Sequence, residues 1–217
     1  MATRFWADSI NAPAVSPTYS AVWDSTADSI RGKLVPDTNP ATGVTGGAIA
    51  QGQGPVYLCS YQLVSLPLDS ISATLAVTKS VFGCMESNAK LNGYLTIIVR
   101  KCDEDGSNPT DIATLVDDVE FEDSIVRGRF LNAGNVADQV FSQSDRLIIE
   151  VGFYVDNAKD YSYTGFVYAN NSIGTDYPEN DTTAFGDSWF ETGDTFTVAS
   201  GDPPAEVVKL GPMFAFA

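Results

Sequence analysis

Apolar and polar residues alternate with a period of two along much of this chain, and that period belongs to half-buried β-strands. Segment 145–156 (DRLIIEVGFYVD) shows the pattern best, because its apolar residues at 147, 149, 151, 153 and 155 all fall on one face. Segment 71–81 alternates in the same way. These two segments predict strands with one face turned towards a core.

Further runs rich in β-branched and aromatic residues also predict strands. They are 56–64, 94–102, 112–119, 125–131, 161–169, 189–190 and 195–198. For 111–119 a brief helix stays open as an alternative, because its apolar spacing fits either element. About eight strands separated by turn signals, with no βαβ alternation and no regular repeat, predict an all-β antiparallel β-sandwich. The jelly roll is the common form of such a sandwich at this chain length.

Composition changes along the chain predict three regions. Residues 1–55 are rich in Pro, Ala, Thr, Ser and Gly and predict an extended N-terminal arm or linker, most clearly at 36–55. Residues 56–200 hold the jelly-roll-like domain, and residues 201–217 form an apolar tail that ends in MFAFA. An ordered arm needs support from its own domain or from a neighbouring subunit. The tail either closes the core or docks on a partner.

The net charge of −16, from 12 basic and 28 acidic residues, restricts the partners. Phosphate binding depends on clustered Lys and Arg, and the basic residues here lie singly or as the pair Arg100-Lys101. We therefore expect no nucleic-acid and no membrane partner. No signal peptide is recognisable, and no apolar run reaches the roughly 18 residues that span a bilayer. The acidity is typical of a soluble protein, and the alternative interpretation is repulsion that keeps copies of the chain apart before assembly.

Histidine is absent, which removes Ser-His-Asp and Cys-His nucleophiles and the usual zinc sites. The three cysteines, Cys59, Cys84 and Cys102, form no CxxC motif and lie in or beside apolar stretches. We expect all three cysteines to be reduced and to lie in the core. A disulfide between Cys59 and Cys84, or between Cys84 and Cys102, remains an alternative. No spacing indicates the paired carboxylates of a glycosidase. The sequence therefore predicts no catalytic residue and no cofactor.

Two acidic loops are candidates for calcium, and the first resembles the start of a calcium-binding loop. In 103–107 (DEDGS) the distal bidentate Glu of an EF-hand is missing, because Ile112 stands near its place, and strands flank the loop. In 176–183 (DYPENDTT) the same residue types form ordinary turns. We predict no metal site. Whether the Asp103/Asp105 loop or the Asp176–Asp181 loop binds a metal stays open.

Aromatic residues gather around one expected hairpin: Tyr154, Tyr161, Tyr163, Phe166 and Tyr168. Strands commonly use such residues to fill their own core. An exposed aromatic face is also how sandwich modules bind sugars or partner proteins. The cluster therefore supports an alternative function, a receptor- or glycan-binding module on a tail or head fibre that takes a host glycan.

Three stretches together resemble a family of small structural proteins, virion- or capsid-associated, encoded among tailed-phage genes. They are RFWADSINAPAVSPTYSAVWDSTADSIRGKL (4–34), SDRLIIEVGFYVDN (144–157) and TDYPENDTTAFGDSWFE (175–191). This chain departs from the family pattern by continuing 27 residues beyond Phe190. The resemblance implies a location in the virion, on the capsid surface, after synthesis in the host cytoplasm. It offers no catalytic residues.

From these features we expect a non-enzymatic capsid decoration (cement) protein that stabilises the phage head by bridging capsid subunits. Its expected partners are the major capsid protein and copies of itself, in a homo-oligomer for which a trimer is one arrangement. The expected docking residues are apolar side chains of the arm and the tail: Phe5, Trp6, Val15, Pro17, Trp23, Phe214 and Phe216.

Overall fold

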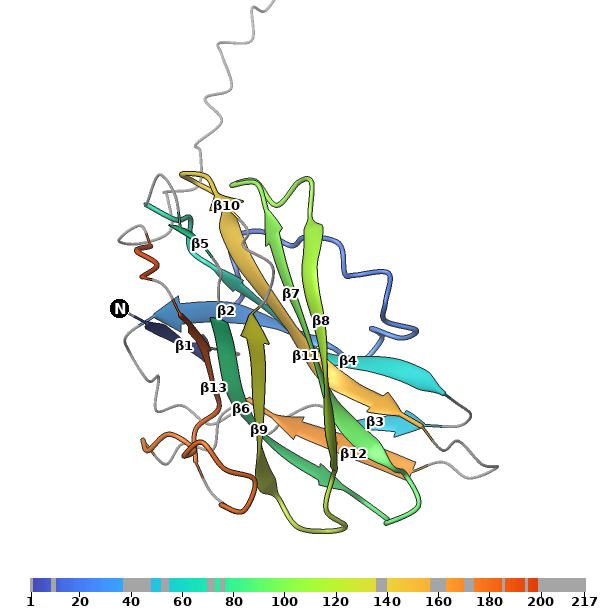
Figure 1. Cartoon of the computed structure of the whole chain (residues 1–217). Coiled ribbons are helices and arrows are strands. Elements are labelled where there is room, and N and C mark those ends of the chain that lie inside the picture. The colour runs from blue at the N-terminus through green and yellow to red at the C-terminus, as the bar shows by residue number, and fades with distance from the viewer. Residues whose placement is uncertain are drawn as a thin grey trace, which may run out of the picture.

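A computed structural model of the chain describes residues 2–8, 11–36, 48–51, 55–69, 73–74, 77–135, 140–156, 163–169, 174–184, 186–193 and 195–198. Every regular element in these ranges is a β-strand, which confirms the all-β prediction (Figure 1). None of these ranges contains a helix of the length and apolarity that a bilayer crossing needs. The tail at 201–217 lies outside the described residues.

The described ranges contain thirteen strands. They are β1 (Thr3–Asp8), β2 (Ile30–Pro36), β3 (Ala48–Gln51), β4 (Val56–Ser65), β5 (Ala73–Thr74), β6 (Val77–Glu86), β7 (Gly93–Cys102), β8 (Thr110–Glu120), β9 (Arg127–Asn135), β10 (Val140–Phe141), β11 (Arg146–Val155), β12 (Tyr163–Tyr168) and β13 (Trp189–Thr192). β5 and β10 form a small separate ladder, and the other eleven belong to one sheet.

The main sheet is mixed and strongly curled, so that it forms a half-barrel (Figure 1). From one end, β8, β7, β11, β4, β2, β1, β13 and β6 pair in that order, and only the β2–β4 pair is parallel. One edge of β6 pairs with β13 and then with β12, which carries β3, while its other edge pairs with β9. β9 thereby comes close to β8 across an open seam in the sheet.

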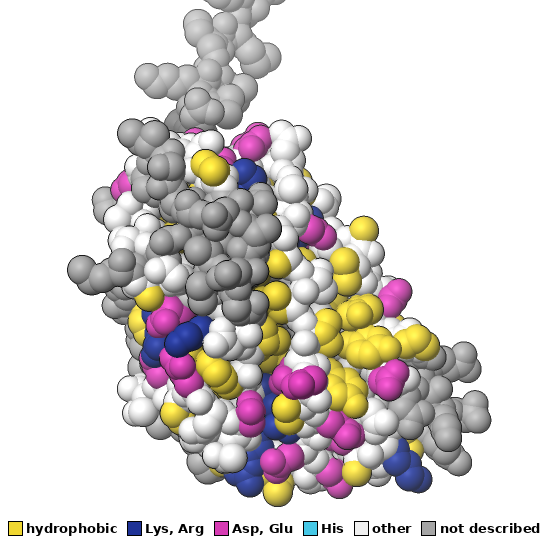
Figure 2. All heavy atoms as spheres, in the orientation of Figure 1, with side chains coloured by type: hydrophobic (Ala, Val, Ile, Leu, Met, Phe, Trp, Pro, Cys, Tyr) yellow, Lys and Arg dark blue, Asp and Glu magenta, His cyan; other side chains and the backbone are white. Residues whose placement is uncertain are grey.

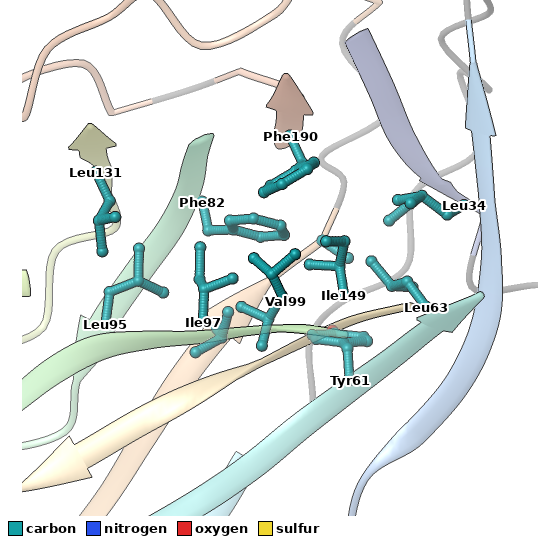
Figure 3. Packing of buried hydrophobic residues seen from close by; sticks show 14 of the residues in the cluster. Leu34, Tyr61, Leu63, Phe82, Leu95, Ile97, Val99, Leu131, Ile149 and Phe190 are labelled. Carbon is teal, nitrogen blue, oxygen red and sulfur yellow. The ribbon is translucent and has the colours of Figure 1, made fainter. Parts of the chain in front are cut away.

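The core fills the hollow of this curl. Figure 3 shows side chains from β4, β7 and β11 pointing at side chains from β6 and β13 on the opposite wall. The five apolar residues predicted to share one face of the strand at 145–156 all lie in this core with no exposed surface. The alternation of these residues in the sequence therefore predicted the inner face of β11 correctly.

The arm expected at 1–55 contributes strands to the same sheet. β1 pairs with β13 and β2, and β2 pairs with β4, so residues 3–36 are joined to the sheet on both sides. β1 alternates cleanly, with Phe5 and Ala7 buried between half-buried neighbours. The alternating segment is short and is followed by Ser and Pro residues, so the sequence alone does not identify it as a strand. The extreme linker stretch, 36–55, lies largely outside the described residues.

Two strand predictions need correction. The strand expected at 71–81 is divided into β5 and β6, and residues 71, 72, 75 and 76 lie outside the described part. The helix alternative for 111–119 is wrong, because this stretch is β8 and pairs along β7. Its weak alternation arises from register shifts that place extra residues in β8 opposite β7.

A β-bulge between β4 and β11 makes glycine necessary at position 152. The register shifts between Val151 and Gly152, so Ser60 becomes an extra residue in β4. This bulge turns the backbone of Leu58 and Cys59 towards β11. A Cβ at position 152 would lie 2.0 Å from the Leu58 carbonyl oxygen.

Replacing Gly152 with Ala is therefore expected to lower the free energy of unfolding by at least about 3 kcal/mol, because neither backbone can move away. Urea unfolding followed by tryptophan fluorescence measures this change. Gly174→Ala is the control, since its Cβ meets nothing within 4 Å and only the φ of 69° opposes it, at a cost of about 1–2 kcal/mol. Equal losses in the two variants would contradict the steric explanation.

Candidate binding surfaces

The segment at residues 15–25, which we call the strap, lies along the outer face of β4, β11 and β7 (blue in Figure 1). Val15 packs there on a buried cluster of Val64, Cys102 and Ile148. At the other end of the strap, Trp23 packs on Cys59 and Ile98. The central strands are therefore buried on both faces, by the core within and by the strap outside.

The buried carboxylate of Glu150 holds the strap to the sheet. Its oxygens accept hydrogen bonds from Trp23 Nε1 at 2.6 Å and from the backbone N of Ser20 at 3.1 Å, both in the strap. Within the sheet they accept from Gln62 Nε2 at 2.8 Å and from Arg100 Nη1 at 2.6 Å. Glu150 has no exposed surface, and all these donors are needed to offset its desolvation.

Arg100 extends this network to a second point of the strap. Its Nη1 donates to the carbonyl oxygen of Thr18 at 2.6 Å, and its Nε donates to Asp111 Oδ1. Asp111 also accepts a hydrogen bond from the Ser20 hydroxyl. Strap, β7, β8 and β11 are thus connected by a single set of charged hydrogen bonds.

Replacing Glu150 with Leu is expected to destabilise the fold by about 3 kcal/mol, because the Trp23 N–H would stay buried without its acceptor and Arg100 would lose its buried carboxylate partner. Chemical denaturation measures the loss. Glu179→Leu is the matched control, since it removes only an exposed ion pair with Lys79, 3.0 Å long, and is expected to cost less than about 1 kcal/mol. A loss of similar size in both variants would refute the stabilising role of the network.

Beyond the end of the strap, three tyrosines form a continuous row across the outer face. Tyr154 of β11 lies directly opposite Tyr57 of β4 and Tyr94 of β7 in the strand register. The ring centroids are 4.8 Å apart for Tyr57–Tyr154 and 6.4 Å apart for Tyr94–Tyr154. All three side chains are partly exposed. Figure 2 shows apolar side chains gathered over this part of the sheet. We call these residues the tyrosine row.

Carboxylates surround the tyrosine row. Asp156 accepts a hydrogen bond from the Tyr154 hydroxyl at 3.2 Å, and Glu120 lies opposite Tyr94 on β8. Burial and then the charges of Glu120, Asp156 and Glu86 raise the pKa of Tyr94. Tyr94 therefore stays neutral, and the tyrosine row lies in a negative potential, which favours contact with neutral or cationic groups and disfavours anions.

The aromatic cluster expected around one hairpin is divided between two places. Phe166 and Tyr168 lie on β12 with centroids 6.2 Å apart and nearly parallel rings, while Tyr154 belongs to the tyrosine row. Tyr163 packs at the edge of the core, and Tyr161 lies outside the described residues. Sequence reasoning missed Tyr57 and Tyr94, because only strand pairing brings them next to Tyr154.

A second surface is the open groove of about 510 Å³ at the seam between β8 and β9. It is lined by Thr114, Leu115, Val116, Asp117, Asp118, Phe130, Leu131 and Asn132. Figure 2 shows acidic and apolar side chains side by side in this part of the molecule. The groove combines an apolar floor with carboxylates on its rim.

Asp117 is the least satisfied carboxylate of the groove. Its Oδ1 accepts the Val119 backbone N–H at 3.2 Å, while its buried Oδ2 accepts no hydrogen bond. Burial and the nearby charge of Asp181 raise its pKa to about 6, against the weaker opposing effect of Arg129. Asp181 itself accepts the Phe130 N–H at 2.7 Å. Similarly, burial raises the pKa of Glu86, at the end of β6, to about 7.

Because the folded-state pKa of Asp117 lies above the unfolded value, the folded state loses stability as the pH rises from about 4 to about 6. Asp117→Asn is therefore expected to be more stable than the wild type at pH 7.5 by about 1 kcal/mol, after allowance for solvent screening. At pH 3.5 the two proteins are expected to be equally stable. Urea unfolding at both pH values measures the free energies of unfolding of the two proteins. If the variant differed from the wild type by the same amount at both pH values, the raised pKa of Asp117 would not be the cause.

The carboxylates of the two acidic loops bind groups of the protein itself, within the loop at 103–108 and on β1 for Asp176. Asp103 accepts the Asn108 side-chain amide at 2.7 Å, and Asp105 accepts the Ser107 backbone N–H at 2.9 Å. Hydrogen bonding from the Ser107 side chain and then from its backbone lowers the pKa of Asp105. In the second loop Asp176 binds Arg4 at 2.8 Å and Trp6 Nε1 at 2.8 Å. Among the described residues, no group of three or more Asp, Glu or Cys side chains is arranged to hold a metal ion.

The residues expected to dock on a partner mostly pack within the chain. Phe5 has no exposed surface and belongs to the core. Trp23 of the strap is 7% exposed, and Pro17 is buried. Trp6 and Val15 are half-buried against other outer clusters. Their burial leaves little ring surface for another subunit. Phe214 and Phe216 lie outside the described residues. A docking role for this set stays a prediction.

The three cysteines are buried and free, as expected. Burial raises the pKa of the Cys59 and Cys84 thiols well above the ordinary value and that of Cys102 to about 11. These thiols are therefore protonated and inert at neutral pH.

Comparison of the sequence with known proteins identifies no relative: no protein-family model matches it, and no curated protein gives a match.

Proposed function

We propose that this chain is a non-enzymatic virion structural protein, a capsid decoration (cement) protein that stabilises the phage head by bridging capsid subunits. The proposal rests on the resemblance of segments 4–34, 144–157 and 175–191 to tailed-phage structural proteins. Its partners are the major capsid protein and copies of itself in a homo-oligomer. Its place is the capsid surface, after synthesis in the host cytoplasm.

The tyrosine row is the observation that best supports a role in binding. Tyrosine is enriched at protein interfaces, because it combines a large apolar ring with a hydroxyl group and loses little conformational entropy on binding. Here the three rings lie on adjacent strands, and the strap beside them is fixed by Glu150. A rigid aromatic surface of this kind binds without reorganisation.

The net charge of −16 fits an accessory protein of high copy number. Repulsion between free copies keeps them apart until a capsid surface of complementary charge is available. A jelly-roll-like sandwich stays our proposal for the finer fold. In this proposal, the β4-β11-β7 and β6-β13 walls of the single curled sheet, which face each other across the core, would serve as the two layers.

A glycan-binding module on a tail or head fibre is the second candidate, and the same tyrosine row favours it. Sugar rings stack on exposed aromatic faces, and neighbouring carboxylates such as Asp156 accept hydrogen bonds from sugar hydroxyls. The negative potential around the row restricts this candidate to neutral or cationic glycans.

Replacing Tyr154 with Ala, which removes the centre of the row, is expected to weaken binding to purified heads of the encoding phage at least about tenfold. Co-sedimentation measures this affinity. Tyr168→Ala is the control, because it removes a partly exposed ring elsewhere on the surface and is expected to bind like the wild type.

Two outcomes would contradict the proposal. Absence of the wild-type protein from purified particles would overturn the virion function. Equal binding by both variants would remove the tyrosine row from the interface. A glycan array separates the second candidate: binding of host polysaccharide by the wild type but not by Tyr154→Ala, without binding to heads, would replace the first function with the second.

A further inference from the structure

The seam between β8 and β9 leaves a strand edge without a partner. β8 is the last strand of the sheet, so its outer edge pairs with no strand in the described part of the chain. Across the seam, β9 pairs with β6 on its other edge. Close to the connecting turn, the Arg129 guanidinium donates to the Glu120 carbonyl oxygen, and from there the strands separate to form the groove.

The loop at 174–184 already occupies part of the β9 edge. The Phe130 N–H donates to Asp181, and the Gly128 N–H donates to the carbonyl oxygen of Thr183 at 2.9 Å. The free hydrogen-bonding edge of the groove is therefore mainly that of β8. An unpaired edge of this length, eleven residues, is a template for an added strand.

The side chains of the groove specify what such a strand would carry. Val116 is 42% exposed, and it offers an apolar contact. Asp117 and Asp118 lie beside it, and Asp181 faces them closely enough to perturb Asp117. The buried Oδ2 of Asp117 lacks a hydrogen-bond donor. A cationic side chain would supply that donor and neutralise the carboxylates.

We propose that the β8 edge, in the groove formed with β9, binds an extended segment of a partner protein as an additional strand, and that this segment carries a lysine or arginine that pairs with Asp117. Backbone hydrogen bonds along β8 provide affinity, and alternate side chains of the segment contact Val116 and the carboxylates. The groove volume lies in the range of ordinary ligand pockets. This inference is independent of the virion function.

Charge disfavours a second copy of this chain pairing edge to edge through residues 117–120. Two β8 strands side by side would bring Asp117, Asp118 and Glu120 of one copy against the same residues of the other. Like charges on neighbouring strands destabilise the pair. The same carboxylates attract a basic segment, so the edge selects a partner by charge.

The test uses the full chain and three synthetic peptides: acetyl-TVKVTV-amide, its Lys→Glu analogue TVEVTV, and TVKPTV, whose proline lacks an N–H. Amide hydrogen exchange of residues 114–118 and NMR titration report binding. TVKVTV is expected to protect these amides. TVEVTV is expected to bind at least about tenfold more weakly, because its Glu is repelled by the carboxylates of the groove. TVKPTV is expected to bind at least about tenfold more weakly, because its proline cannot donate a backbone hydrogen bond to β8. Equal binding of all three would overturn the inference.

Two matched substitutions locate the site. Val116→Lys places a charge on the edge itself, whereas Val140→Lys makes the same change at a more exposed valine, on β10 of the small ladder. Val116→Lys is expected to abolish binding of TVKVTV, and Val140→Lys is expected to leave it unchanged. Asp117→Asn is expected to remove the preference for TVKVTV over TVEVTV. If the two lysine variants behave alike, the groove is not the site.

Shortening the chain after residue 200 tests the competing occupant, its own C-terminal segment. If residues 114–118 exchange at the same rate in the full and the shortened chain, the edge is free for a partner, as proposed. If shortening alone exposes these amides, the chain's own segment occupies the edge, and the proposal of a partner segment is overturned.

Discussion

The buried ion pair between Glu150 and Arg100 is the interaction on which the outer layer of this protein depends. Asp24 and Ser25 pair with the backbone of β4 at the end of the strap, but residues 15–23 belong to no strand and need other contacts to hold them in one position. The carboxylate accepts hydrogen bonds from both Ser20 and Trp23, and Arg100 donates to the Thr18 carbonyl. Few alternative positions of the strap would give each of these donors and acceptors a hydrogen-bond partner. The network therefore determines where the strap lies on the sheet, even where its net contribution to stability is small.

The position of the strap also decides which part of the outer face is left for binding. The strap covers the outer face from Val15, beside Ile148, to Trp23, beside Ile98. Its last residues, Asp24 and Ser25, then hydrogen-bond to the backbone of β4. The next outward-facing residue of β11 beyond the strap is Tyr154, with its neighbours from β4 and β7. The tyrosine row is thus the uncovered end of a face that is otherwise buried. Its rigidity follows from the packing beside it.

The sequence predicted the central strands well because their inner faces alternate, and the limits of β4, β7 and β11 agree with expectation to within a residue or so. It missed β1 and β2, since their apolar runs, such as Phe5-Trp6 and Leu34-Val35, are short and stand among Pro, Ser and charged neighbours. The near-continuous apolar run around Glu150 was a usable signal, because strands buried on both faces read this way. A charged residue inside such a run indicates a buried partner. The pairing of Tyr57 and Tyr94 with Tyr154 depends on long-range register, which no local pattern contains.

The open seam has a physical explanation in the residues of β8. Closing the half-barrel would require β8 to pair with β9, but register shifts in the β7–β8 ladder add residues near Asp117 and Asp118 and twist the strand. Closure would also bury these carboxylates against Asp181, at a cost in desolvation and repulsion. The Asp181 side chain already caps the Phe130 N–H that a closing strand would need. The same acidic residues that keep the barrel open therefore determine that whatever completes it must bring positive charge.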